Sequence, residues 1–132
     1  MLVKTLKYFP KVDNFELIQE YKDWTYNRVV VVTDYTEIVG VALVRVSVNI
    51  KLIEIIALET NPRNKGIGTK IINYLKEIAR RKRASILLTS LKSSLGFYIK
   101  LGFEPLDGAI SDTIMMWKPR YDYCQKLPRN NV

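Results

Sequence analysis

Apolar and polar positions along this chain predict seven strands and three helices. Short apolar runs, bounded by turn residues, predict strands over Leu2–Phe9, Arg28–Thr33, Ile38–Val48, Leu52–Leu58, Ser85–Ser90, Phe103–Pro105 and Thr113–Trp117. Apolar residues at helical spacing predict a short helix capped by Asp13 or Asn14 and ending by Tyr21 or Trp24, a long helix over Gly66–Lys82, and a short helix around Tyr98 capped by Ser93 or Ser94.

The order of these segments predicts how they are arranged. Three successive strands with short connections, from Arg28 to Leu58, imply an antiparallel meander. The strand, long helix and strand that follow imply a parallel crossover. We therefore expect an α/β (α+β) fold, with a mixed central sheet of about six or seven strands and helices on both faces. Gly40 indicates a bulge or a close approach within this sheet.

The chain has 132 residues, a common size for one domain. We assign residues 1–119 to a single domain, with a turn at Asp107–Ala109, and residues 120–132 to a C-terminal tail.

The stretch Leu52–Ile72 joins an apolar strand, a glycine-containing turn and the long helix. This order places free backbone N–H groups at a helix N-terminus, which favours binding of an anion such as phosphate. Arg63, Lys65 and Lys70 surround the start of the helix, and no acidic residue follows before Glu77. Cations there oppose the helix dipole unless an anion is bound. The alternative is a solvated loop whose basic residues face water.

The motif Arg63-x-x-Gly66-x-Gly68 resembles the acyl-CoA pyrophosphate loop of the GNAT N-acetyltransferases. The strand before it, Glu54–Leu58, resembles the central strand of that family. The segment Gly96–Phe103, reading GFYIKLGF, resembles its second signature. Both signatures occur in the family order, and the similarity spans roughly residues 29–118.

This resemblance implies a binding site for acetyl-CoA as the donor substrate. The pyrophosphate would be held by the glycine loop, which comprises Arg63, Asn64, Lys65, Gly66, Ile67, Gly68 and Thr69. The central strand would separate from its parallel neighbour, and its backbone would pair with the pantetheine arm at Ile56, Ala57 and Leu58.

Glu54 is the candidate general base. Strand periodicity places it on the same face as Ile56 and Leu58, within an otherwise apolar strand. Burial disfavours the charged form of a carboxylate and would make Glu54 a stronger base. The alternative is a partly exposed Glu54 that pairs with Lys51 or Arg45. Glu59, nearer the loop and of opposite parity, is a weaker candidate.

Tyr98 matches the family tyrosine, four residues before Gly102, and is the candidate acid that protonates the departing thiolate. The alternative is a core aromatic, as we expect for Phe97 and Phe103. Leu91 stands where many family members have a cofactor-binding Asn, so that contact is not transferred to this chain.

The implied function is an N-acetyltransferase that moves an acetyl group from acetyl-CoA to a primary amine by direct transfer in a ternary complex. One alternative is a non-catalytic acyl-CoA-binding sensor. A second is a basic nucleic-acid-associated protein, suggested by Arg80–Arg83 and a formal net charge of +8, which could act on an RNA-borne amine. The cations at the end of the long helix also complement its dipole. The sequence leaves the acceptor open.

Residue content limits the other possibilities. The chain has no histidine and one cysteine, Cys124, so we expect no His-based triad, no intrachain disulfide and no metal centre. No apolar run approaches the length of a membrane span, and Lys4, Lys7 and Pro10 interrupt any signal-peptide core. We expect a cytoplasmic monomer or homodimer that does not associate with membranes.

Overall fold

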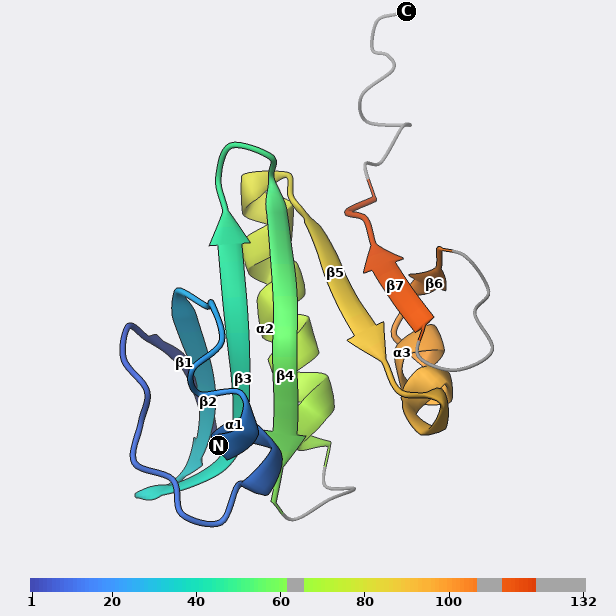
Figure 1. The fold of residues 1–132 in the computed structure, drawn as a ribbon. Helices are drawn as coiled ribbons and strands as arrows, with labels where there is room; N and C mark the ends of the chain where they lie inside the picture. The colour runs from blue at the N-terminus through green and yellow to red at the C-terminus, as the bar shows by residue number, and fades with distance from the viewer. Residues whose placement is uncertain (62–65, 107–112, 121–132) are drawn as a thin grey trace, which may run out of the picture.

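The structure is a computed structural model that describes residues 1–61, 66–106 and 113–120 (Figure 1). Its strands are β1 (Leu2–Leu6), β2 (Arg28–Asp34), β3 (Glu37–Ser47), β4 (Leu52–Thr60), β5 (Ser85–Ser90), β6 (Glu104–Pro105) and β7 (Thr113–Trp117). Its helices are α1 (Glu16–Glu20), α2 (Ile67–Lys82), α3 (Leu95–Lys100) and the short 3₁₀ turn η1 (Lys92–Ser94).

The seven described strands form one sheet in the order β1-β2-β3-β4-β5-β7-β6. Strands β4 and β5, which α2 connects, pair in parallel, and all other neighbours pair antiparallel. The predicted mixed sheet, the meander and the parallel crossover are therefore confirmed. Strands β5 and β7 have the bounds that their apolar runs predict. The predicted turn at Asp107–Ala109 and residues 121–132 lie outside the described residues.

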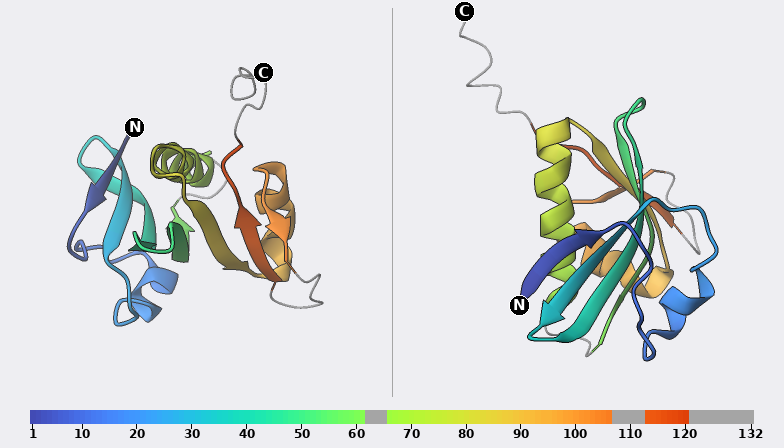
Figure 2. Two further views of the ribbon diagram at one scale, coloured as in Figure 1. Left: turned by 90° about the horizontal axis from the view of Figure 1, so that it is seen from above. Right: turned by 90° about the vertical axis from the view of Figure 1, so that its left-hand side faces the viewer.

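Helices cover both faces of the sheet, as expected (Figure 2). Helices α2 and α3 pack on one face, where their apolar residues join those of β2 to β5 and β7 in the larger core cluster. Helix α1 packs on the other face, where Phe15 and Ile18 meet residues of β2, β3 and β4 in a second cluster. The sheet is therefore buried on both sides over β2, β3 and β4.

Gly40 of β3 lets α2 approach the sheet closely. A Cβ atom on Gly40 would lie 2.6 Å from Cγ2 of Ile67 and 3.2 Å from Cδ1 of Ile71. The register between β2 and β3 also shifts beside it, which leaves Val39 as an extra residue. The bulge and the close approach expected here are thus both present.

The start of α1 differs from the prediction. Its N-cap residue is Phe15 and forms no side-chain capping bond, so the expectation that Asp13 or Asn14 caps this helix is wrong. The cap comes from β4 instead, because Oε1 of Glu59 accepts the backbone N–H of Ile18 at 2.9 Å. Tertiary packing, which brings β4 under α1, therefore replaces a local cap.

Two details of the other helices also differ. Ser94 is the N-cap residue of α3, but its side chain forms no capping bond. In α2, Lys76 is only 9 % exposed, although it is a charged residue. Its ammonium group donates to the carbonyl of Leu101 at the end of α3 and lies 5.4 Å from the ring centroid of Trp117. Burial, followed by the charge of Arg80, lowers the pKa of Lys76.

Across the ranges that the structure describes, no helix is both long enough and apolar enough to cross a membrane.

Candidate active site

The ladder between β4 and β5 ends halfway along β4. It has four residue pairs, from Leu52 opposite Ser85 to Ile55 opposite Leu88. Beyond these, residues 56–60 pair only with β3 among the described residues, and the two strands diverge towards their C-terminal ends (Figure 1). Because N–H and C=O groups point alternately to the two sides of a strand, this stretch presents unpaired backbone groups towards the gap.

A bulge at Ile56 changes which side chains share a face. The register between β3 and β4 shifts by one residue there, leaving Ile56 without a partner. Ile55 and Leu58 consequently both pack on the α2 side, whereas Ala57 packs with the α1 cluster. We predicted one face for Glu54, Ile56 and Leu58. That prediction is wrong for Leu58, because the extra residue breaks the two-residue period.

The first turn of α2 lies at the same end of the sheet. Gly66 is the N-cap residue with φ of 73°, and within the described residues no side chain caps the turn. A Cβ on Gly66 would meet nothing within 4 Å, but the left-handed conformation itself favours glycine. The turn contains no acidic residue. Its free N–H groups and the positive end of the helix dipole therefore suit an anion.

The rest of the predicted loop is only partly described. Ile67, Gly68 and Thr69 form the first turn of α2, with Ile67 buried and Thr69 half-buried. Arg63, Asn64 and Lys65 lie outside the described residues, so their roles stay predictions.

The Phe97 ring of α3 lies against Gly68 of α2. A Cβ on Gly68 would lie 3.1 Å from Cζ of Phe97 and 3.8 Å from Cδ2 of Leu58. The missing side chain thus lets α3 and β4 both approach the first turn of α2. We expected Phe97 in the core, which is wrong, because it is 37 % exposed. The same expectation is confirmed for Phe103, which is buried.

Tyr98 is buried among aromatic rings beside this contact. Its ring centroid lies 4.9 Å from that of Phe97 and 5.6 Å from that of Phe103, edge-to-face in both cases. The hydroxyl has no hydrogen-bond partner within the described part of the chain. Burial raises the pKa of Tyr98 to about 12, because desolvation disfavours the phenolate.

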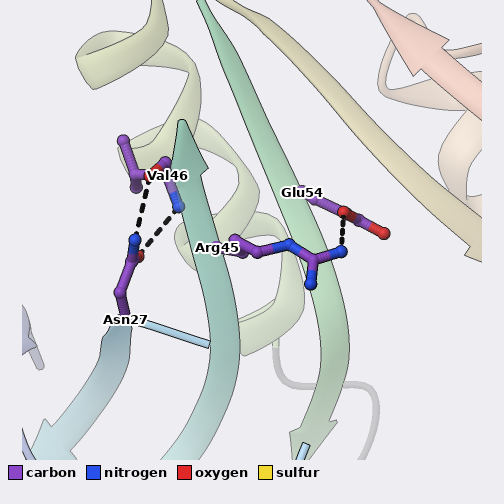
Figure 3. Close-up of polar contacts among 4 residues, drawn as sticks. All are labelled: Asn27, Arg45, Val46 and Glu54. Atoms are coloured by element: carbon purple, nitrogen blue, oxygen red, sulfur yellow. Dashed lines mark hydrogen bonds and ion pairs between the residues drawn. The ribbon is translucent and has the colours of Figure 1, made fainter. Parts of the chain in front are cut away.

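Glu54 lies on the opposite face of β4 and pairs with Arg45 (Figure 3). The two residues stand directly opposite each other across β3 and β4, and Nη2 of Arg45 lies 2.5 Å from Oε1 of Glu54. The Glu54 side chain is 31 % exposed. The burial that we expected for it is therefore absent, and the alternative pairing with Arg45 is present. Glu54 also lies opposite Leu87, one pair before the β4–β5 ladder ends.

The structure thus brings together most of the predicted site that it describes. The backbone of β4 after the bulge, the first turn of α2 and Tyr98 meet on the α2 side of the gap. Glu54 stands at the closed end of the gap but on the α1 side. Glu59 is occupied in capping α1. No three His, Cys, Asp or Glu side chains of the described residues lie close enough together to hold a metal ion.

Comparison with known proteins identifies the family. A family model described as an acetyltransferase (GNAT) domain matches residues 25–105. The chain belongs to the GNAT acetyltransferase family. Comparison with curated protein sequences gives no significant match.

Solved structures of GNAT proteins have the same fold. PaiA N-acetyltransferase from Thermoplasma acidophilum, solved with coenzyme A, is 22 % identical with a TM-score of 0.60, over 68 % of this chain and 59 % of that one. An aminoglycoside 6′-N-acetyltransferase complexed with coenzyme A is 21 % identical with a TM-score of 0.60, over 72 % and 75 %. Ard1 from Thermoplasma volcanium is 16 % identical with a TM-score of 0.65, over 90 % and 99 %. At these identities the likeness shows the fold, and this GNAT chain spans less than two thirds of the PaiA chain.

Sequence reasoning missed two residues of the site. Arg45 was considered only as one of two partners for Glu54, and a cross-strand register could have singled it out. Phe97 directly precedes Tyr98 of the motif, but its position in the sequence does not indicate that its ring packs against Gly68.

Proposed function

We propose that this chain is an N-acetyltransferase that moves an acetyl group from acetyl-CoA to a primary amine in a ternary complex. The observation that carries the proposal is the half-paired strand β4, which opens beside a helix N-terminus and a buried hydroxyl. Neither the helix N-terminus nor the hydroxyl has a side-chain partner among the described residues. Membership of the GNAT family supports it, as do the coenzyme A complexes of similar folds.

The donor would lie along the gap between β4 and β5. Its pyrophosphate would accept bonds from the N–H groups of the first turn of α2 and from the loop before it. Its pantetheine amides would pair with the free backbone groups of residues 56–58. A backbone N–H near Leu58 would then polarise the thioester carbonyl, as fixed donors do in an oxyanion hole.

The chemistry divides between the two faces of the sheet. The amine nitrogen attacks the thioester carbon, the C–S bond breaks, and the electron pair of that bond stays on sulfur. Glu54, on the α1 face, accepts the proton that the nitrogen loses, through a water molecule. Arg45 holds the Glu54 carboxylate in place. The amine therefore approaches from the α1 face of the sheet, next to the area that α1 covers.

Tyr98 acts from the α2 face on the sulfur. Its hydroxyl donates a hydrogen bond to the departing thiolate, which takes a proton from solvent before the free thiol leaves, while Glu54 returns the proton it accepted to solvent. With a pKa of about 12, Tyr98 holds its proton throughout the neutral range. A thiol has a pKa of roughly 8.5, so complete transfer from Tyr98 is uphill and the hydrogen bond supplies most of the stabilisation.

An acceptor screen tests this proposal. Free thiol released from acetyl-CoA is measured with polyamines, aminoglycosides, amino acids, peptides and aminoacyl-tRNA, and mass spectrometry locates the acetyl group on the product. Release that requires a particular amine and Tyr98 supports the transferase. Tight acetyl-CoA binding without release on any amine would support the sensor instead.

A further inference from the structure

A cavity lies at the C-terminal end of α2, far from Gly66. Its volume is about 300 Å³, and it opens between the β3–β4 turn and the C-terminus of α2, which lie side by side in Figure 1. Four of its lining residues are cations, and none of the described residues that line it is acidic. The cations are Lys51, Arg81, Lys82 and Arg83. The rest of the wall is mostly apolar and comprises Val46, Ser47, Val48, Leu52 and Ala84.

Three of these cations form no ion pair with an acidic side chain of the described residues. The two ion pairs of the described residues are Arg45–Glu54 and Arg80–Glu77. Arg80 does not line the cavity and also lies 5.3 Å from the ring centroid of Trp117. Lys51, Arg81 and Lys82 are exposed and form no ion pair with a described residue. The positive charge at this cavity is therefore available to a ligand.

Helix dipole effects explain only part of this cluster. Cations in the last turn of α2 complement its negative end, which accounts for Arg81 and Lys82. Lys51 comes from a different segment, the β3–β4 turn, so the sequence of the helix alone does not account for its place in the cluster. The carbonyls of Ala79 and Arg80 at the helix end already accept the N–H groups of Ala84 and Arg83, so they do not face an anion unpaired.

Two of the cavity's cations have an unfavourable, left-handed backbone conformation. Lys51 has φ of 51° and Arg83 has φ of 55°, and both line the cavity. Gly or Asn adopts this left-handed conformation at lower cost in a turn or after a helix. The N–H of Ser85 donates to the carbonyl of Lys51 at 3.0 Å and fastens the two segments together. The chain thus keeps cations at two strained positions that face one space.

We propose that this cavity binds a phosphate-bearing ligand, namely a nucleotide unit, either free or within a nucleic acid strand. Guanidinium and ammonium groups are the usual partners of phosphate oxygens. The volume is at the lower end of small-ligand sites, and the apolar wall can take a sugar or base. The sixteen residues of α2 separate the cavity from the glycine turn, a distance of about 24 Å at 1.5 Å per residue. The proposal is therefore independent of the acetyl-CoA site.

The test uses the full chain without added coenzyme A, because coenzyme A itself carries an adenine nucleotide that would compete for the cavity. Binding of a short fluorescein-labelled single-stranded RNA is followed by anisotropy, and binding of AMP by calorimetry. The cavity variant is Lys51→Ala/Arg81→Ala. The control is Lys4→Ala/Lys22→Ala, which removes the same charge from two exposed positions elsewhere. Thermal unfolding confirms that both variants fold.

The cavity variant should bind RNA or AMP at least about tenfold more weakly, whereas the control should stay within about twofold. For RNA, the slope of log K against log salt should also fall by about 1.4, the value for two lost phosphate contacts on a single strand. If AMP displaces the RNA, the cavity binds a single nucleotide. If AMP does not displace the RNA, the ligand is a nucleic acid strand. Equal weakening in both variants would overturn the proposal, since affinity would then follow net charge alone. So would the absence of binding of either probe to the parent.

Discussion

Glu59 of β4 accepts the backbone N–H of Ile18 in α1 at 2.9 Å, across 41 positions of sequence. The same strand supplies Glu54 and the unpaired backbone of the candidate donor site. One carboxylate therefore fixes α1 over the face from which we propose that the amine approaches, and a second lies beside the gap in the sheet.

Replacing Glu59 with Ala should lower the free energy of unfolding by about 1 kcal/mol, the usual cost of losing an N-terminal cap. Glu59→Gln should keep most of the stability, because an amide oxygen can still accept the N–H of Ile18. Glu20→Ala, an exposed change in the same helix, serves as the control. Denaturant unfolding measures all three, and an equal loss in Glu59→Ala and Glu20→Ala would contradict the capping role.

Tyr98→Phe should separate activity from stability. Turnover should fall roughly 10²- to 10⁴-fold, the usual contribution of a positioned proton donor. The variant should nonetheless be more stable than the parent without ligand, by about 1 kcal/mol, because it removes a buried hydroxyl that has no partner among the described residues. Steady-state kinetics and unfolding at neutral pH measure the two effects. Turnover within twofold of the parent would remove Tyr98 from the mechanism.

The raised pKa of Tyr98 predicts a loss of stability in alkali. Burial raises this pKa from 10.0 to about 12, so the unfolded chain releases the proton first. Below pH 10 the group is protonated in both states and adds no pH dependence. Between pH 10 and 12 the stability should fall by up to about 1.4 kcal/mol per pH unit. Tyr98→Phe should lack this part of the loss, so its advantage should grow from about pH 10 to about pH 12.

Arg45 and Glu54 should be coupled weakly in stability and strongly in catalysis. Their side chains are 38 % and 31 % exposed, so solvent screens the pair and a double-mutant cycle should give no more than about 1 kcal/mol. Glu54→Gln should reduce turnover strongly, because an amide cannot accept the proton of the amine. Arg45→Met should reduce turnover less, because the carboxylate of Glu54 remains. Turnover of Glu54→Gln within twofold of the parent would assign the base to solvent or to another group.

Acetyl-CoA should stabilise the parent by about 2.7 kcal/mol at a hundred times its dissociation constant. Gly66→Val should abolish this gain, because a β-branched residue resists φ of 73° and blocks approach to the first turn of α2. The gain is measured as a thermal shift within each variant, which cancels the strain of the substitution itself. Arg81→Ala, at the other end of α2, should keep the gain. The reverse pattern would place the donor at the wrong end of the helix.

Much of the fold follows from patterns within single segments. The bounds of β5 and β7 and the end of α2 match the predictions, because apolar runs, helical spacing and turn residues are local signals. The β4 bulge was not predictable in this way. All residues of its run Ile55-Ile56-Ala57-Leu58 are apolar. The sequence therefore does not indicate which of them face α1 and which face α2, and it does not reveal an extra residue.

The remaining misses come from distant contacts. Glu59 caps a helix far away in sequence, and Lys76 becomes buried because the end of α3 supplies a carbonyl. The motif placed Tyr98 and Gly66 near the site. It could not show that Glu54 would be matched to Arg45, since that depends on the register of β3.

Because the ladder between β4 and β5 is short, hydrogen exchange of the β4 amides should show whether a ligand occupies the gap. Within residues 56–60, amides that point to β3 are protected from hydrogen exchange, whereas those that point to the gap have no strand partner among the described residues. In the free protein, fast and slow exchange should therefore alternate along one strand. A ligand that enters the gap slows only the fast set, and so the backbone itself records whether the site is filled.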